Sequence, residues 1–549
     1  MQEIINFLYN NLIYKGELDC VVIFFIEIPK AMVLKNTVLK KLTAHDYKKT
    51  NQQQLTTDLD LNDVQLELQT PARSSDAIMG DEKWRNKSWR LPSCVPVTII
   101  LSLVILLVVL PFLDEKISIE DKKDSQQYAT KWATCHNSCR ASLVESIPEG
   151  LAYRPSEVIH SATYDTWQNL LQIAEKSIEI ASLYWTLKGS DVYPYPSAHK
   201  GEEILHGLMQ AGVHRGIKIR IAQNAPTPEN PNLDTEFLEK HGAAEVRSLN
   251  FQKLVGGGVL HTKFWLIDRK HAYVGSANMD WRSLTEVKEM GVAIYNCSCL
   301  ASDLGKIFDV YWYLGKEGAT VPSKWPDQFG TKFNRDHPMN LTFNATSPSN
   351  VFISSSPPQF CPKGRTSDID TVLDVIGSAN QFIHIAVMDY FPLTIYTPKI
   401  KHWPVIDDAL RSAAVDRKVT IKLLVSHWNH TRPSMKYFLE SLTTLTQSFP
   451  WVRIEAKFFE VPSSEAQSKI PFARVNHNKY MVTDNTAYIG TSNWSGDYFI
   501  NTGGAAVVVR DPNTELDDAL RDEESLRQQL VAVFDRDWNS PYAVPISQK

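Results

Sequence analysis

The sequence predicts an α/β fold of two similar lobes related by a pseudo-two-fold axis, preceded by a single transmembrane helix. Two observations predict the lobes: amphipathic helical runs alternate with short apolar strands, and this pattern occurs twice at an offset near 205 residues. A third observation, an uncharged apolar stretch from Leu91 to Leu113, predicts the membrane helix. The length of 549 residues accommodates two or three domains.

The apolar stretch divides the chain into three parts. A helix over residues 91–113 is long enough to span a bilayer, whereas buried core helices rarely run so far without polar residues. A cleaved signal peptide would begin nearer the N-terminus. Residues 1–90 are polar and irregular, which predicts a largely disordered cytoplasmic tail, and residues 114–140 are expected to form a lumenal stalk.

The orientation of this helix follows from its flanks and from the sequence after it. Basic residues precede the span, which favours a cytoplasmic N-terminus. Sequons that are usable only in a lumen lie downstream, at Asn296, Asn340, Asn344 and Asn429. Five of the seven cysteines also lie downstream. We therefore expect a type II membrane glycoprotein in which residues 114–549 are lumenal.

Four of the cysteines form two closely spaced pairs. Cys135 and Cys139 would share a face of a helix, and Cys297 and Cys299 would share a face of a strand. Two cross-links between the pairs would tie the stalk to the first lobe. The alternative is a four-thiolate zinc site, which an oxidising compartment disfavours. Cys361 has no obvious partner.

The internal repeat sets the lobe boundaries. Three apolar segments of the first half recur in order in the second: Ser177–Trp185 with Phe382–Tyr390, Gly216–Ala222 with Val419–Val425, and Glu245–Leu249 with Val452–Phe459. The first lobe is expected over residues 141–325 and the second over 361–549. The Pro-, Ser- and Asn-rich segment 326–360 is expected to be a linker.

Each half carries one copy of a motif in which His and Lys are two residues apart. The motifs are His261-Thr-Lys263 with Asp268 and Asn278 following, and His477-Asn-Lys479 with Asp484 and Asn493 following. On a strand, residues two apart point to the same side, so each half presents an imidazole beside an ammonium group. The duplication predicts that both sets meet at one cavity.

This set of side chains suits a phosphodiester substrate. Lys263 and Lys479 would neutralise the non-bridging oxygens, and Asn278 and Asn493 would donate further hydrogen bonds to them. One His can attack phosphorus while the other protonates the leaving oxygen. This chemistry needs no metal or other cofactor, and the sequence has no convincing cluster of divalent-metal ligands. Asp268 and Asp484 would lie on alternate strand positions from the His, which favours structural roles.

At these residues the chain resembles the phospholipase D superfamily, and most of all its animal type II membrane branch, the third and fourth phospholipases D. The shared strings include L-H-T-K-F-W, G-S-A-N-M-D-W-R-S-L-T, Y-N-C-S-C-L and R-V-N-H-N-K-Y-M-V-T, and they cover roughly residues 135–545. The resemblance implies two phospholipase D-type lobes. It also implies a lysosomal 5′-exonuclease on single-stranded DNA and RNA, released from its anchor by proteolysis, with transphosphatidylation of lysosomal phospholipids as a further activity.

The sequence departs from that branch in three places. The N-terminal tail is longer, and a C-terminal cysteine that would pair with Cys361 is absent. Glu289 matches the family's acidic residue that orients a catalytic His, whereas the second half has Asn501 near the equivalent place. This asymmetry, together with the family's more frequent use of the first His, assigns His261 as nucleophile and His477 as general acid and then base.

Two other functions compete with the exonuclease. One is a phospholipase D or transphosphatidylase acting on membrane lipids, and the other is a non-catalytic membrane glycoprotein. The net charge of −5 gives no global attraction to nucleic acid, so a local site must hold it. Five aromatic residues could stack bases, line an acyl groove or belong to the core: Trp185, Trp281, Tyr390, Trp494 and Tyr498. The oligomeric state stays open, a homodimer included.

Overall fold

The computed structural model describes residues 139–344, 348–511 and 524–549. The expected tail, the expected membrane helix at 91–113 and the stalk as far as residue 138 lie outside the described residues. Within the described ranges, no helix is both long enough and apolar enough to span a bilayer.

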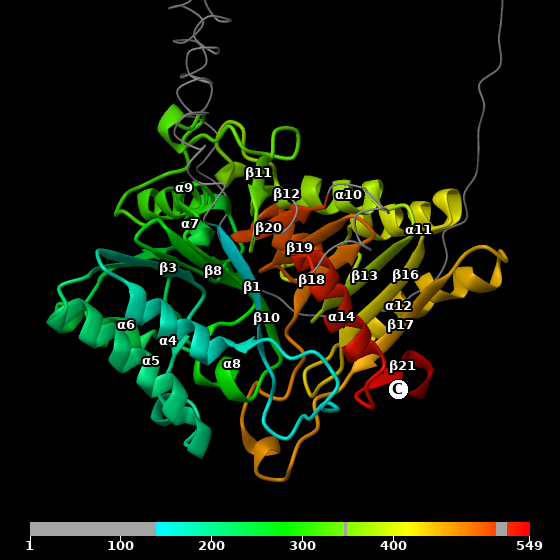
Figure 1. Ribbon diagram of the computed structural model, residues 1–549, viewed down its shortest axis with the longest axis horizontal. Helices are drawn as coiled ribbons and strands as arrows, with labels where there is room; N and C mark the ends of the chain where they lie inside the picture. Colours follow the sequence, from blue (N-terminus) through cyan, green and yellow to red (C-terminus); the bar gives the residue numbers. More distant parts are fainter. Residues whose placement is uncertain (1–138, 345–347, 512–523) are drawn as a thin grey trace, which may run out of the picture. The chain divides into compact units, whose positions relative to one another are not determined.

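Two mixed β-sheets, one from each half of the chain, form the centre of an α/β fold (Figure 1). The first sheet has the order β2 (Ser161–Ala162), β1 (Arg140–Ser146), β10 (Glu289–Tyr295), β8 (His271–Gly275), β7 (Phe264–Ile267), β3 (Ser177–Ser182), β5 (Lys218–Asn224), β6 (Glu245–Leu249). The second has the order β11 (Met339–Thr342), β12 (Pro348–Ser356), β20 (Gly504–Arg510), β19 (Thr486–Gly490), β18 (Lys479–Thr483), β13 (Phe382–Val387), β16 (Thr420–Ser426), β17 (Ile454–Phe459), β21 (Ala543–Pro545).

The two sheets repeat one topology. The run from β1 to β6 has the same strand order as the run from β12 to β17, and each strand pair has the same direction. In both sheets three neighbouring strands are parallel. The other strand pairs are antiparallel, except that the two-residue β2 is parallel to β1. The strands expected from the repeat, β3 with β13, β5 with β16 and β6 with β17, occupy matching places, so the predicted duplication is confirmed.

Helices pack on the outer faces of both sheets and also between the sheets. Those of the first half are α4 (Thr163–Ile173), α5 (His199–Met209), α6 (Leu233–Lys240), α7 (Phe251–Val255), α8 (Trp281–Thr285) and α9 (Ser298–Leu314). Those of the second are α10 (Asp368–Ser378), α11 (Val405–Arg417), α12 (Ser434–Thr443), α13 (Gly496–Ile500) and α14 (Leu526–Trp538). Two short ladders, β4 (Trp185–Thr186) with β9 (Met279–Asp280) and β14 (Leu393–Thr394) with β15 (Lys401–His402), complete the fold.

One hydrophobic core lies between the sheets and includes residues of both halves. It contains Phe264 and Val274 from the first sheet, Tyr480 and Ile489 from the second, and Phe534 from α14. Separate cores lie under the outer helices of each half. Strands β8 and β10 contact β19 directly. Burial of this shared apolar surface holds the two halves together.

The segment 326–360, expected to be a linker, contributes β11 and β12 to the second sheet. Strand β12 takes the place that β1 has in the first sheet, so the second lobe begins before residue 361. The sequence predicted that β12 was part of a linker because the strand is rich in serine. Its serines can nevertheless be buried in the sheet because their hydroxyl groups are hydrogen-bonded. Ser354 donates to Asp368 (2.7 Å) and Ser356 donates to the carbonyl of Thr502 (2.9 Å).

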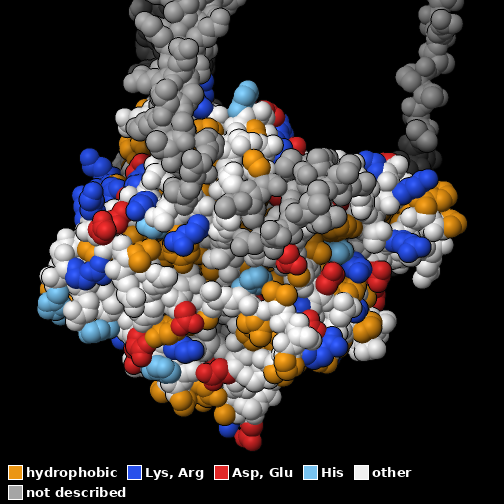
Figure 2. All heavy atoms as spheres, in the orientation of Figure 1, with side chains coloured by type: hydrophobic (Ala, Val, Ile, Leu, Met, Phe, Trp, Pro, Cys, Tyr) orange, Lys and Arg blue, Asp and Glu red, His pale blue; other side chains and the backbone are white. Residues whose placement is uncertain are grey.

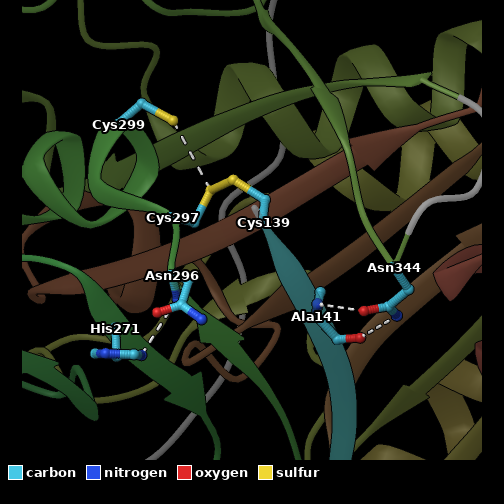
Figure 3. Close-up of a disulfide and its surroundings, with 7 residues drawn as sticks. All are labelled: Cys139, Ala141, His271, Asn296, Cys297, Cys299 and Asn344. Atoms are coloured by element: carbon cyan, nitrogen blue, oxygen red, sulfur yellow. Dashed lines mark hydrogen bonds between the residues drawn. A yellow bond between two sulfur atoms is a disulfide. The ribbon is translucent and has the colours of Figure 1, made fainter. Parts of the chain in front are cut away.

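A disulfide joins Cys139 to Cys297 (Figure 3). It ties the start of β1 to the start of α9, and it supports the predicted cross-link over the four-thiolate zinc site because two of the thiols are oxidised. Cys299 is also disulfide-bonded, whereas Cys135 lies outside the described residues. The expected local geometry was wrong, because Cys297 is the N-cap of α9 and Cys299 lies in its first turn, not on a strand. Cys361 is a half-buried free thiol.

The sequons lie on the surface with one partial exception. Asn340, Asn344 and Asn429 are exposed, and Asn296 is half-buried beside the disulfide (Figure 3). The amide of Asn344 donates to the Ala141 carbonyl (2.7 Å) and its oxygen accepts from the Ala141 N–H (3.3 Å). A glycan on Asn344 would replace one amide hydrogen and leave the other for this contact.

Candidate active site

The two motifs meet because each is bonded to the other half of the chain. The N–H of His261 donates to the carbonyl of Gly503 (2.9 Å), and the N–H of His477 donates to the carbonyl of Lys288 (2.8 Å). Gly503 immediately precedes β20, and Lys288 immediately precedes β10, the equivalent strand. These reciprocal bonds bring both histidines to one place between the sheets.

A cavity of about 590 Å³ opens onto this place. Its lining includes both motif histidines and both motif asparagines, together with Glu289 and Tyr498. The lysines lie behind the histidines: Lys263 donates to the carbonyl of His261, and Lys479 donates to that of His477 (2.7 Å). The predicted His and Asn of both halves therefore line one cavity, and the two predicted Lys lie against the histidines behind its wall.

The buried lysines have strongly altered acidities. Burial lowers the pKa of Lys263 well below its ordinary value, and the charge of Lys479 lowers it further. Burial also lowers the pKa of Lys479 to about 7, although the carboxylates of Glu289 and Asp389 oppose the shift. The cavity thus favours an anionic ligand, which would restore both ammonium charges.

The two histidines have different hydrogen-bond partners. Nδ1 of His261 lies 2.9 Å from the carbonyl oxygen of Thr491, which can only accept, so this nitrogen carries the proton and Nε2 has the lone pair. Nδ1 of His477 lies 2.8 Å from the carboxylate of Glu289. Burial lowers the pKa of both rings. The pKa of His261 lies well below its ordinary value, whereas at His477 the Glu289 carboxylate opposes the shift.

Glu289 thus contacts the histidine of the opposite half. The residue equivalent to Glu289 in the second lobe is Gly504, not Asn501, because each is the first residue of its strand. A side chain at Gly504 would collide with the hydroxyls of Ser356 and Ser492. The Glu289 carboxylate has no counterpart at His261, where the Thr491 carbonyl takes its place.

The chain matches the family model described as PLD3/4, PLD-like domain, over residues 156–464. The chain belongs to this family. It is 49% identical over 411 residues to the protein named 5′-3′ exonuclease PLD3 of Xenopus laevis, covering 75% of this chain and 82% of that relative. The mouse protein named 5′-3′ exonuclease PLD4 is 44% identical, with coverage of 75% and 81%. A solved structure similar to this chain is the phosphatidylserine synthase of Haemophilus influenzae, which is 12% identical at a TM-score of 0.45, with coverage of 70% of this chain and 86% of that one.

In this PLD3/4 family member the motif aspartates hold the backbone. Asp268 accepts hydrogen bonds from the N–H groups of residues 175–177 at the start of β3, the shortest at 2.7 Å. Asp484 accepts from residues 380–382 at the start of β13. Both carboxylates fix the entry to the strand beside the motif strand, and neither lines the cavity.

The motif asparagines have partners that the sequence analysis missed. The amide of Asn278 donates to the Tyr184 hydroxyl (3.3 Å), and that of Asn493 donates to Tyr498 (3.0 Å) and Asp389 (3.4 Å). Tyr184 and Asp389 are equivalent, each two residues beyond its strand, so extending the repeat past the strand ends would have found them. Burial raises the pKa of Asp389 to about 6.

The aromatic residues divide between the cavity and the core. Trp185 and Tyr498 line the cavity, as both base stacking and an acyl groove would require. The other three expected aromatics, Trp281, Tyr390 and Trp494, are core residues with 1% exposure or less. The cavity also has aromatic residues that sequence reasoning did not select, namely Tyr184, Tyr396, Trp428 and Phe472. They lie in irregular segments between strands, where no periodic pattern identifies them.

Proposed function

We propose that this protein is a phosphodiesterase of the phospholipase D superfamily that acts as a 5′-3′ exonuclease on single-stranded nucleic acid through a phosphohistidine intermediate. The observation that carries the proposal is the placement of His261 and His477 at one cavity, with a carbonyl behind the first and a carboxylate behind the second. The names of the relatives, at 44–49% identity over most of the chain, support the exonuclease activity.

In the first step Nε2 of His261 attacks phosphorus. The N–P bond forms as the bond to the leaving oxygen breaks, and the imidazolium of His477 gives that oxygen its proton. Glu289 stabilises the charged form of His477. The Thr491 carbonyl fixes the neutral tautomer of His261 that has its lone pair at Nε2.

In the second step water attacks the phosphohistidine. Neutral His477 accepts a proton from the water, the N–P bond breaks, and His261 recovers its lone pair. In both steps the two ammonium groups and the two amides stabilise the oxygens of the pentavalent transition state. We further propose that the two lobes are related by a pseudo-two-fold axis through this cavity, supported by the reciprocal bonds to Gly503 and Lys288.

The test uses the purified full-length chain with 5′-hydroxyl single-stranded DNA and RNA, and with phosphatidylglycerol as the competing lipid substrate, at acidic pH. We expect stepwise release of nucleotides from the 5′ end. His261→Ala and His477→Ala should abolish release, whereas His402→Ala, at an exposed position of β15, should not. Acid quenching during turnover should trap a phosphoryl group on His261 and none on His477.

Three results would change the proposal. Transfer on phosphatidylglycerol without nucleotide release would make the lipid activity the main one. An adduct on His477 alone would reverse the roles of the histidines. Substantial turnover by either alanine variant would refute the shared site, and inactivity of the folded wild type toward both substrates would favour a non-catalytic glycoprotein.

We also propose that residues 114–549 are lumenal and reach the lysosome, with proteolytic release from the anchor. The Cys139–Cys297 disulfide and the exposed Asn340, Asn344 and Asn429 support a lumenal setting. Glycosidase treatment of the cellular protein should increase its gel mobility. Asn493, also in a sequon, should stay unmodified because it is 3% exposed in the cavity wall. An unchanged mobility with a protease-accessible C-terminus on intact vesicles would reverse the topology.

A further inference from the structure

A buried cluster of four charged side chains lies behind the candidate site. Lys288, with a fully buried side chain, has its Nζ 2.9 Å from Asp537 and 3.9 Å from Glu145. Arg536 lies 2.7 Å from Glu145 and 3.0 Å from Asp537. The cluster joins β1, the residue before β10, and the last helix, α14, which crosses the middle of the molecule in Figure 1.

The cluster is balanced and closed to solvent. Its two cations and two carboxylates have side-chain exposures of 1% or less. Burial alone would raise the pKa of Glu145, but the hydrogen bonds and charge of Arg536 and the charge of Lys288 lower it below its ordinary range. The Tyr153 hydroxyl donates to Asp537 (2.6 Å), and burial together with the charge of Asp537 raises the pKa of the buried Tyr480.

The dipeptide Lys288–Glu289 contacts both this cluster and His477. The carbonyl of Lys288 accepts the His477 N–H (2.8 Å), and the Lys288 N–H donates to Val475 (2.9 Å). The next residue, Glu289, places its carboxylate 2.8 Å from Nδ1 of His477. Successive residues of an extended chain point to opposite sides, so Lys288 faces α14 while Glu289 faces the cavity.

We propose that Lys288 and Asp537 are positioning residues whose buried ion pair fixes the Lys288–Glu289 dipeptide and thereby the carboxylate that orients His477. The inference rests on the proposed function, in which His477 is the proton donor. It gives α14, at the end of the chain, a role in the proton transfer although none of its residues lines the cavity.

The four buried charges define the geometry of this region more than they stabilise the fold. Well-packed apolar side chains usually stabilise a core at least as well as a buried ion pair, because desolvation offsets the attraction. An ion pair also fixes the position of each partner. Because Lys288 and Glu289 are joined by one peptide unit, fixing the Lys288 side chain also fixes the Glu289 carboxylate.

The experiment compares pH profiles of turnover on a single-stranded oligonucleotide for the full-length chain and the variants Lys288→Met, Asp537→Asn and the double variant. Four groups set the charge balance at His477: Glu289 favours the imidazolium, whereas Lys479, Lys263 and a charged His261 oppose it. Loosening Glu289 weakens the favourable interaction, so the alkaline limb should move to lower pH by about half a unit. Glu289→Gln should move it further, by about 1–3 units, because the opposite charge is removed.

The matched control is Asp303→Asn. Asp303 pairs with Arg365 at 2.6 Å, is equally buried, and lies on α9 away from the cavity. It should lower the melting temperature without moving the limb. Because Lys288 and Asp537 act as one unit, each single variant should move the limb as far as the double variant does.

Two outcomes would overturn the inference. The first is an alkaline limb at the wild-type pH in Lys288→Met or Asp537→Asn. The second is an alkaline limb that moves as far in Asp303→Asn as in those variants. A histidine-selective ¹³C NMR titration reads the pKa of His477 without turnover, its signal identified by loss in His477→Gln. If the wild type cleaves no oligonucleotide, the proposed function fails, while an unchanged His477 titration in these variants still decides against the positioning role. Asp537→Asn keeps side-chain shape and serves if Lys288→Met does not fold.

Discussion

His384 should make the fold sensitive to acid. It lies on β13 with 8% exposure. Its ring stacks on Phe534 of α14, with the ring centroids 4.4 Å apart, and its centroid lies 4.6 Å from that of Phe382. Burial lowers its pKa from 6.5 to about 3, and the charge of Lys422 adds to the shift. The folded protein therefore keeps this ring neutral at pH values where the unfolded chain binds a proton.

The sign and size of the effect follow from proton linkage. Between pH 6.5 and about 3 the unfolded state binds more protons at this site, so the free energy of unfolding falls as pH falls. Each pH unit corresponds to about 1.4 kcal/mol, so lowering the pH from 7 to 5 costs about 2 kcal/mol at His384. His384→Leu removes the titrating group and keeps an apolar side chain against Phe534.

The assay is urea unfolding of wild type and His384→Leu at pH 7 and pH 5. Between pH 7 and pH 5, the free energy of unfolding of the variant relative to that of the wild type should rise by about 2 kcal/mol, whatever the difference is at pH 7. His402→Leu, on the exposed β15, is the control and should track the wild type. A pH dependence in His384→Leu equal to that of the wild type would refute the reasoning.

Three further predictions concern the site and the cross-link. The kcat/KM should fall above the pKa of His477 and then more steeply above about pH 7, where Lys479 of the substrate-free protein loses its proton, and Lys479→Arg should remove the second, steeper phase; a single phase in both proteins would contradict this. Asp484→Asn weakens the acceptor for residues 380–382 and should lower the free energy of unfolding by about 1–3 kcal/mol with little change in KM, measured by denaturation and kinetics. Cys139→Ser should cost about 2–5 kcal/mol by the same denaturation assay, and a wild-type midpoint would show that the cross-link does not stabilise the fold.

The sequence predicted the repeat and the meeting of the two motifs because both depend on periodic local patterns. Alternating apolar residues identified β3 and β13, and the paired His and Lys identified the site. The target of Glu289 was not predictable in this way, because its contact with His477 crosses 188 residues and depends on how the lobes pack. Composition misled at β12, whose serines resemble a loop until their buried partners are known. Cys297 and Cys299 fit a strand by spacing, but they begin a helix.

The reciprocal backbone bonds have a consequence for biosynthesis. His261 is hydrogen-bonded to Gly503 and His477 to Lys288, so both rings take up this arrangement only when the two halves are folded against each other. A growing polypeptide acquires it only after residue 503 has been translated, and α14 follows later still. A chain shortened to end before Gly503 should therefore be inert toward nucleic acid, which delays activity until the second half has been synthesised.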